Sequence, residues 1–243
     1  MKFGSITTGI VSDGLVFNMD AANRASYTFY TANSSSYNTV DPTQVGTLTN
    51  GIAFLSPPLS SSCWEFDGVN DYVDCGTAIP TELGASCTGV SVSAWIKQSD
   101  ASTQGNIFNL CSPAGTYGTM ALWSNTSGKL QLHLNGNYPR IEYTFSSTDW
   151  HHIVGVYDGT LAVANRLKLY VDGVSVGSLN DNSGGSPSPT SFDFPSVSPK
   201  TTRIGWGWSN SYTFYGLISN THIYNRGLSA NEVLHNYNAL KSR

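Results

Sequence analysis

Charged side chains are scarce in this sequence. Asp, Glu, Lys and Arg together make up 12% of the 243 residues, about half of the roughly 25% that is usual for soluble domains. The formal net charge of -4 gives no basic footprint for nucleic acid or for an anionic membrane surface. Hydrophobic residues at 40% and aromatic residues at 12% exclude a disordered chain, which is depleted in both. The sequence therefore predicts a folded domain with an uncharged polar surface.

Long apolar runs are also missing. No stretch approaches the roughly 18 residues that a membrane-spanning helix requires, so we expect no membrane partner. The N-terminal segment MKFGSITTGIVSDG has a single Lys2 and no continuous apolar region, which argues against a secretory signal peptide. If the protein is nonetheless extracellular, we expect it to be released by another route, such as cell lysis.

Cysteines are few, and none forms the Cys-x-x-Cys pair of a zinc knuckle. The four are Cys63, Cys75, Cys87 and Cys111. If Phe66 pairs with Tyr72 across a hairpin, Cys63 lies opposite Cys75, at a separation that a disulfide bridges in suitable geometry. Four free, partly buried thiols are the alternative, and we favour it because no signal peptide is expected.

Most of the chain shows the period-2 alternation of a sheet with one solvated face. In residues 129–134, for example, three leucines alternate with Lys, Gln and His. Steps such as Asp67-Gly68 and Asp172-Gly173 supply the positive φ angles of tight turns between such segments. About a dozen short strands in a domain of this length predict two stacked antiparallel sheets.

One helix is predicted, near the C-terminus. Ser229 and Glu232 have the spacing of a capping box, with Leu228 and Val233 where a hydrophobic staple would form. One apolar stripe follows, made of Val233, Leu234, Tyr237 and Leu240. The helix is therefore expected to dock on the sandwich.

Six motifs, in order along the chain, resemble those of laminin-G-like domains, which are concanavalin A-like lectin sandwiches. They are residues 66–73 (FDGVNDYV), 92–96 (VSAWI), 150–154 (WHHIV), 169–173 (LYVDG), 203–205 (RIG), and 216–218 (GLI) leading to 223–232. The resemblance implies an all-β, antiparallel, two-sheet jelly-roll sandwich with one short C-terminal helix. Residues 1–13 are then an N-terminal arm, and residues 14–243 form one laminin-G-like β-sandwich domain. A shared fold of this kind does not decide function.

The two ends of the chain resemble a narrower variant, which is found in bacteriophage virion proteins. Residues 14–23 (GLVFNMDAAN) and 234–239 (LHNYNA) carry this likeness. It implies a non-enzymatic structural protein of the virion surface, a capsid decoration or appendage subunit made in the host cytoplasm. Its partners would be other virion structural proteins and further copies of itself. A phage protein needs no signal peptide, which fits the N-terminal sequence.

No catalytic set is apparent, so we expect no enzyme and no catalytic residue. Glu65-Phe66-Asp67 resembles the start of the Glu-x-Asp-x-x-Glu pattern of sandwich-type glucanases, but Asn70 stands in the third acidic position. A glycosidase needs a positioned acid and a second carboxylate, so we interpret this segment as a surface hairpin. His151 and His152 are adjacent on a strand, point to opposite faces and cannot share a metal.

Oxygen ligands gather around the same turn. The candidates for a Ca²⁺ site are Asp67, Asn70, Asp71 and Asp74. Some laminin-G-like domains bind calcium near this position, but the acidic pair usual later in the family is here Ser219 and Asn220. Four ligands also fall short of the six to eight that calcium takes. We therefore expect no cofactor, with Asp67 and Asp71 accepting hydrogen bonds from the turn backbone.

Aromatic residues are concentrated in residues 206–215 (WGWSNSYTFY). A Trp or Tyr ring stacks on the apolar face of a sugar, and neighbouring amides and hydroxyls fix its orientation. The candidate glycan- or partner-binding residues are Trp208, Asn210, Tyr212 and Tyr215. Contacts with the core or with neighbouring subunits are the alternative, and for this segment we favour it over glycan binding. We expect core positions for Trp64, Trp95, Trp123, Trp150, Trp206 and Phe214.

These patterns leave three functions open. A virion surface protein that binds host-surface glycans is the first hypothesis, and a free, extracellular carbohydrate-binding (lectin) module is the second. A glycoside hydrolase is the third, since related sandwiches include glucanases. The sequence does not identify the ligand, the oligomeric state or the place on a virion.

Overall fold

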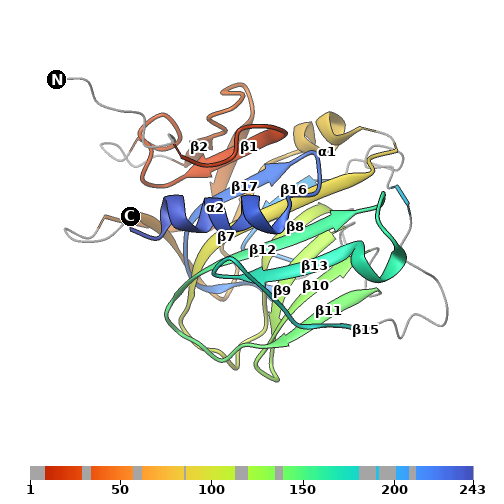
Figure 1. The fold of residues 1–243 in the computed structure, drawn as a ribbon. Coiled ribbons are helices and arrows are strands. Elements are labelled where there is room, and N and C mark those ends of the chain that lie inside the picture. Colours follow the sequence, from red (N-terminus) through yellow and green to blue (C-terminus); the bar gives the residue numbers. More distant parts are fainter. Residues whose placement is uncertain are drawn as a thin grey trace.

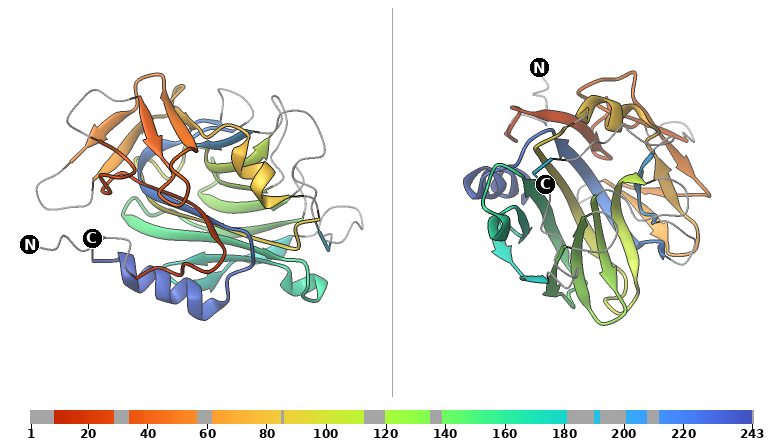
Figure 2. Two further views of the ribbon diagram at one scale, coloured as in Figure 1. Left: turned by 90° about the horizontal axis from the view of Figure 1, so that it is seen from above. Right: turned by 90° about the vertical axis from the view of Figure 1, so that its right-hand side faces the viewer.

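The computed structural model describes residues 9–28, 34–56, 62–84, 86–112, 120–134, 139–180, 190–191, 201–207 and 212–242. These residues form two antiparallel sheets stacked face to face, with a helix across the outside of one sheet (Figures 1 and 2). The expected two-sheet sandwich is confirmed. No helix among the described residues is long and apolar enough to cross a membrane.

One sheet has eight strands. In spatial order they are β14 (Val174–Val176), β13 (Leu167–Val171), β12 (Trp150–Asp158), β7 (Gly89–Gln98), β17 (Tyr215–Tyr224), β5 (Cys63–Asp67) and β4 (Ala53–Leu55), with β1 (Leu15–Asp20) pairing with β17. The other sheet has nine. They are β15 (Ser178–Asn180), β11 (Arg140–Thr144), β10 (Lys129–Leu134), β9 (Met120–Asn125), β8 (Gly105–Ser112), β16 (Thr201–Ile204), β6 (Tyr72–Asp74), β3 (Val45–Thr49) and β2 (Ser35–Tyr37).

The core lies between the sheets and follows the alternation seen in the sequence. In β10, Leu130, Leu132 and Leu134 are fully buried in it, each contributing about 1.5–3 kcal/mol by leaving water. Their neighbours Lys129, Gln131 and His133 point to the outer face of the nine-stranded sheet. One face of each sheet is thus committed to the core, which leaves two outer faces to explain.

Helix α2 (Ala230–Leu240) covers the outer face of the eight-stranded sheet (Figure 1). The predicted capping box is present, since the Ser229 hydroxyl accepts from Glu232 N and the Glu232 carboxylate accepts from Ser229 N. Leu228 and Val233 are buried against Val154, Val156 and Tyr170 of the sheet. The staple and the docking are therefore confirmed.

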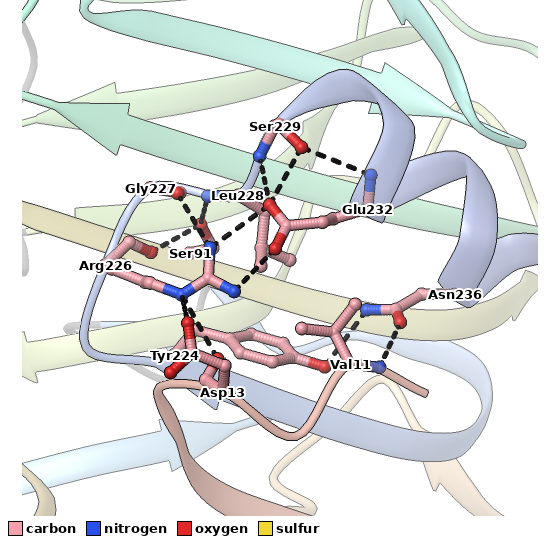
Figure 3. Close-up of polar contacts among 10 residues, drawn as sticks. All are labelled: Val11, Asp13, Ser91, Tyr224, Arg226, Gly227, Leu228, Ser229, Glu232 and Asn236. Carbon is pink, nitrogen blue, oxygen red and sulfur yellow. Dashed lines mark hydrogen bonds and ion pairs between the residues drawn. The ribbon is translucent and has the colours of Figure 1, made fainter. Parts of the chain in front are cut away.

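The helix stripe differs from the predicted one at one position. Leu234 is 43% exposed, whereas Asn236 is buried. Asn236 is accommodated because its amide is fully used: Nδ2 donates to the Tyr224 hydroxyl at 3.0 Å, and Oδ1 accepts from Val11 N at 2.8 Å (Figure 3). A hydropathy pattern alone excludes such a residue from the buried side.

The same junction ties residues 11–13 to the helix through Arg226. Its guanidinium contacts Glu232 at 2.6 Å and Asp13 at 2.9 Å (Figure 3). The hydrogen bonds from Arg226, together with those from Ser229, lower the pKa of Glu232 to about 2. The expected boundary between an arm of residues 1–13 and a domain of residues 14–243 stays a prediction.

Two short helices were not predicted. They are α1 (Ala78–Leu83), which buries Ile79 and Leu83 at one end of the sandwich, and the 3₁₀ helix η1 (Val163–Asn165). Six residues with a proline at their centre are too short for a helical period to appear in the sequence. Tertiary packing of the two apolar side chains therefore decides this conformation.

The hairpin expected around Asp67-Gly68 is not formed. Phe66 pairs with Gly216 of β17, whereas Val73 pairs with β16 and β3 in the other sheet. The turn carries the chain from one sheet to the other, because alternation sets which side a residue faces but not which strand it pairs with.

This topology separates two of the cysteines and determines whether they can form a disulfide. Cys63 begins β5 in the eight-stranded sheet, whereas Cys75 directly follows β6 of the other sheet, and both are free and buried, as is Cys87. Burial raises the pKa of the Cys63 thiol to about 11. The alternative of free thiols is correct for these three, while the Cys111 side chain lies outside the described residues.

Candidate functional site

The outer face of the nine-stranded sheet carries polar and aromatic side chains. Strand pairing lines them up in two rows, one of Glu142, Gln131, Trp123 and Asn106, the other of Arg140, His133, Ala121, Asn109, Arg203 and Asp74. Helix α2 covers part of the opposite outer face, on the eight-stranded sheet, where Glu65 and Asp67 stay exposed. The nine-stranded sheet brings together the larger set of polar and aromatic side chains, and several of them, including Gln131 and His133, are buried.

Two asparagines occupy the centre of this face. Asn106 and Asn109 both have 0% of their surface exposed, and among the described residues neither the oxygen nor the nitrogen of either amide has a hydrogen-bond partner. A buried polar group without a partner costs about 1–3 kcal/mol. We call Asn106 and Asn109 the amide pair.

A β-bulge creates the amide pair. Residues three apart in a regular strand face opposite sides, but the register of β8 against β9 shifts between Asn106 and Phe108. Asn106 then lies opposite Trp123 and Asn109 opposite Ala121, on the same face of the sheet. The alternation of the sequence gives no sign of this bulge, so the amide pair was not predicted.

Trp123 and its neighbours flank the amide pair on one side. The Trp123 ring lies 5.0 Å from the His133 ring and 5.6 Å from the Tyr212 ring, centroid to centroid. Its Nε1 donates to Gln131, and Gln131 in turn donates to Glu142. Burial raises the pKa of Glu142, but its bonds with Lys129 and Arg140 outweigh that effect and hold it below the usual value. These contacts fix the orientation of the Trp123 ring.

A second aromatic cluster lies on the other side of the amide pair. Trp206 stacks on Tyr72 with ring centroids 4.7 Å apart. The Arg203 guanidinium carbon lies 4.2 Å from the Trp206 centroid and 5.6 Å from that of Tyr72, within the range of cation–π attraction. Trp206 was expected in the core but is half-buried on this outer face, because the chain leaves β16 after Ile204 and turns into a hairpin.

That hairpin brings the aromatic segment onto the amide pair. Trp206 pairs with Thr213, and Gly207 N donates to Tyr212 O at 3.1 Å. A Cβ on Gly207 would lie 2.2 Å from Asn106 Nδ2, so only glycine permits this approach. The predicted residue Tyr212 is therefore part of the candidate site.

The other predicted residues of this segment are placed differently or not at all. Trp208 and Asn210 lie outside the described residues. Tyr215 begins β17 in the eight-stranded sheet, is 43% exposed and lies beside Gly68. It does not share the face that carries Tyr212.

A comparison of the sequence with known families identifies the fold. The sequence profile described as the concanavalin A-like lectin/glucanases superfamily matches residues 67–234. The chain belongs to that superfamily. No curated protein sequence gave a match.

Solved structures resemble this concanavalin A-like sandwich at low sequence identity. A Trypanosoma rangeli sialidase in complex with sialic acid has a TM-score of 0.60 and 14% identity, over 92% of this chain and 32% of that one. The receptor-binding domain of botulinum neurotoxin C/D mosaic serotype has a TM-score of 0.61 and 15% identity, over 94% and 52% of the respective chains. The chain thus spans about a third of the first protein and half of the second, and at these identities the likeness shows the fold alone.

In this concanavalin A-like domain the candidate calcium ligands Asp67, Asp71 and Asp74 accept hydrogen bonds from backbone N–H groups in and near the turn. Asp67 Oδ1 accepts from Val69 N at 2.7 Å, and Asp71 Oδ2 accepts from Asp67 N at 3.0 Å. Asp74 Oδ1 accepts from Gly76 N at 2.9 Å. Asn70 lies in the same turn and is exposed. Among the residues described, no three His, Cys, Asp or Glu side chains lie together in a way that could hold a metal ion.

The tryptophans of the sandwich divide between core and outer faces. Trp64 and Phe214 are buried in the core as expected. Trp95, Trp123 and Trp150 are half-buried instead. Trp95 stacks on His152 and Tyr237 under α2. A tryptophan within an alternating strand fits either face, because its large ring is apolar and its N–H tolerates a wet edge.

The two adjacent histidines behave differently. His152 is fully buried, and burial lowers its pKa to about 4. His151 instead contacts Asp172 Oδ2 through Nδ1 at 2.7 Å and Ser147 Oγ through Nε2 at 2.8 Å. This is the order of groups in a serine hydrolase triad, and the sequence did not suggest it, since the three residues come from separate segments.

The contacts around this Ser-His-Asp set favour a structural role. Asp172 Oδ1 accepts from His152 N at 2.9 Å, and Ser147 Oγ accepts from Asp149 N at 3.1 Å. The set therefore ties the turn after β13 and the loop before β12 to the first residues of β12. The glucanase-like pair, Glu65 and Asp67, is exposed on the eight-stranded sheet, away from the amide pair.

Proposed function

We propose that this chain is a non-enzymatic binding module that takes glycans on the outer face of the nine-stranded sheet. The amide pair carries the proposal. Each amide offers a donor and an acceptor, and sugar hydroxyls both donate and accept. Both amides are fully buried, so a sugar that binds them has to displace the groups that cover them. It would then satisfy the unpartnered groups of Asn106 and Asn109, while the flanking rings of Trp123 and Tyr212 meet its apolar face.

The structural neighbours support ligand recognition on this fold. One similar protein was solved as a sialidase with sialic acid, and another is a neurotoxin receptor-binding domain. In both, the part resembling this chain is only a fraction of the whole protein. Their ligands are properties of those proteins, so the ligand of this chain has to be found by experiment.

Binding to a glycan array tests the proposal. We expect the full chain to bind at least one glycan, and Asn106→Ala and Asn109→Ala to weaken that binding at least about tenfold, since a ligand group then loses a buried partner. Asn70→Ala is the matched control, because Asn70 is an exposed asparagine in the Asp67 turn. Silence on every glycan, or full binding by both amide variants, would refute the proposal.

We further propose that the module is a virion surface subunit, a capsid decoration or appendage protein made in the host cytoplasm. Support comes from the phage-like segments 14–23 and 234–239. The first includes β1, which pairs with β17 in the eight-stranded sheet, and the second lies in α2, which packs on the outer face of that sheet. Its partners would be other virion proteins and copies of itself. Detection in purified virions by mass spectrometry tests this role. Absence there, together with glycan binding, would favour the free extracellular lectin module.

The non-enzymatic part of the proposal has its own test. We expect no hydrolysis across a polysaccharide panel and no labelling of Ser147 by a fluorophosphonate. Turnover lost in Glu65→Gln would establish a glycosidase. Labelling lost in Ser147→Ala, with the fold intact, would establish a serine hydrolase.

A further inference from the structure

We infer that the glycan is acidic and that Arg203 selects it by binding its carboxylate. This inference rests on the proposed function and adds a ligand class to it. The shared chemistry is a pyranose that bears a carboxylate, as sialic and uronic acids do. Arg203 is then the specificity-determining residue of the face.

One donor of Arg203, the buried Nε, has no hydrogen bond within the described residues. Its partner there is Asp74, whose Oδ2 lies 3.5 Å from Arg203 Nε. A charge-assisted hydrogen bond is about 2.7–2.9 Å long, and at 3.5 Å Nε remains without a hydrogen bond. Asp74 is also held by the backbone, since its other oxygen accepts from Gly76 N.

The side chain of Arg203 is nevertheless fixed in place. Only 14% of it is exposed, and it lies over the Trp206 ring next to Tyr72. A stacked guanidinium presents its planar fork in one orientation, which matches the two oxygens of a carboxylate. Because little side-chain freedom is left to lose, binding costs less entropy than for a mobile arginine.

Arg203 is also next to the amide pair. It lies directly opposite Asn109 on β8, with Asp74 on its other side on β6. Directly opposed side chains have Cβ atoms about 4.5–5.5 Å apart, so the two side chains are direct neighbours on this face, Asn109 fully buried and Arg203 14% exposed. A carboxylate on the Arg203 fork would leave the Asn109 amide to bind an adjacent ring hydroxyl.

The charge of this face also favours an acidic ligand. Among its described residues, the side chains that are charged at neutral pH are three cations, Lys129, Arg140 and Arg203, and two carboxylates, Glu142 and Asp74. The whole chain has a net charge of -4. A locally positive face on a negative protein favours anionic ligands over neutral ones.

Matched sugars with and without the carboxylate test this inference by isothermal titration calorimetry. One pair is sialyllactose and lactose, and the other is trigalacturonic acid and its methyl ester. We expect the acidic member of at least one pair to bind about tenfold tighter or more, with a preference that falls as salt is raised. The two pairs distinguish a sialic acid from a uronic acid.

Variants assign the preference to one side chain. Arg203→Gln is expected to reduce the acidic sugar to the affinity of its neutral partner, and Arg203→Lys to retain part of the preference. Lys168→Gln, on the eight-stranded sheet, removes the same charge elsewhere and should change nothing. If Arg203→Gln does not fold, Arg203→Lys and the salt dependence still decide.

The outcomes separate the two proposals. Equal binding of acidic and neutral sugars, or a preference kept in both Arg203 variants, overturns the inference and leaves a glycan-binding module. Failure of the unaltered chain to bind any glycan overturns the proposed function as well.

Discussion

The amide pair makes a stability prediction that separates a binding site from ordinary core. We expect Asn109→Val to stabilise the protein. The substitution removes two buried groups without partners, each costing about 1–3 kcal/mol, and places a β-branched residue in a strand. After allowing for imperfect packing of valine, a gain of about 1–3 kcal/mol remains, or roughly 2–12 °C in melting temperature for a chain of this size.

Asn38 supplies the control, since it is equally buried but fully bonded. Its Oδ1 accepts from Asn18 N and Val40 N, and its Nδ2 donates to Val16 O and to Gln44, all within 2.9–3.0 Å. Asn38→Val loses four bonds of about 1 kcal/mol each and leaves two buried partners, Asn18 N and Val16 O, without a bond, a loss of about 4 kcal/mol or more.

Calorimetric unfolding of the two variants beside the unaltered protein measures the contrast. The binding assay should give the opposite ranking, with Asn109→Val unable to bind and Asn38→Val still able to bind where folded. Binding sites commonly contain groups that lower the stability of the folded protein. If Asn109→Val destabilises the protein as much as Asn38→Val does, the amide pair is a structural element and the reasoning fails.

Three further predictions follow from other contacts. The pKa of His152 is about 4 in the folded protein, below its ordinary value of 6.5. The unfolded state therefore binds more protons, and the free energy of unfolding falls as pH drops from about 6.5 to 4. His152→Phe should reduce this pH dependence in denaturant unfolding measured across that range, and an unchanged slope would contradict the prediction. The pKa of Glu232 is also lowered, from 4.5 to about 2, so its contribution to folding stability is present above pH 4.5 and lost towards pH 2. Glu232→Gln should lower the free energy of unfolding by about 1–2 kcal/mol at neutral pH and by less in acid. A loss of stability that does not depend on pH would count against the ion pair. Gly207→Ala should displace Asn106 and weaken glycan binding, because its Cβ would lie 2.2 Å from Asn106 Nδ2. Gly51→Ala is the control: its Cβ meets nothing within 4 Å, and the strain of its positive φ is confined to the turn between β3 and β4. Equal binding by both variants would show that Gly207 does not position the amide.

Much of the fold was readable from local patterns. The alternation of Leu130, Leu132 and Leu134 gave the strands and their buried side, and Ser229 with Glu232 gave the start of α2. These features depend on residues within a few positions of one another. The partner of each strand does not, which is why β5 and β6 were wrongly joined in a hairpin.

The candidate site was much less predictable. Tyr212 was identified from aromatic composition, but Asn106, Asn109 and Arg203 were not. The bulge in β8 reverses the side that Asn109 faces, and Arg203 acquires its neighbours only through strands from three parts of the chain. Whether a buried amide is bonded also depends on contacts distant in sequence, as Asn38 and Asn109 illustrate.

The junction of Arg226 with Asp13 and Glu232 (Figure 3) affects which side of the sandwich would face a larger assembly that the protein is attached to. Residues 11–15 and α2 both pack on the eight-stranded sheet, so a connection made through either segment approaches from that side. The amide pair is on the far side of the sandwich. A subunit held this way presents Arg203 and its neighbours outward, towards whatever the assembly meets.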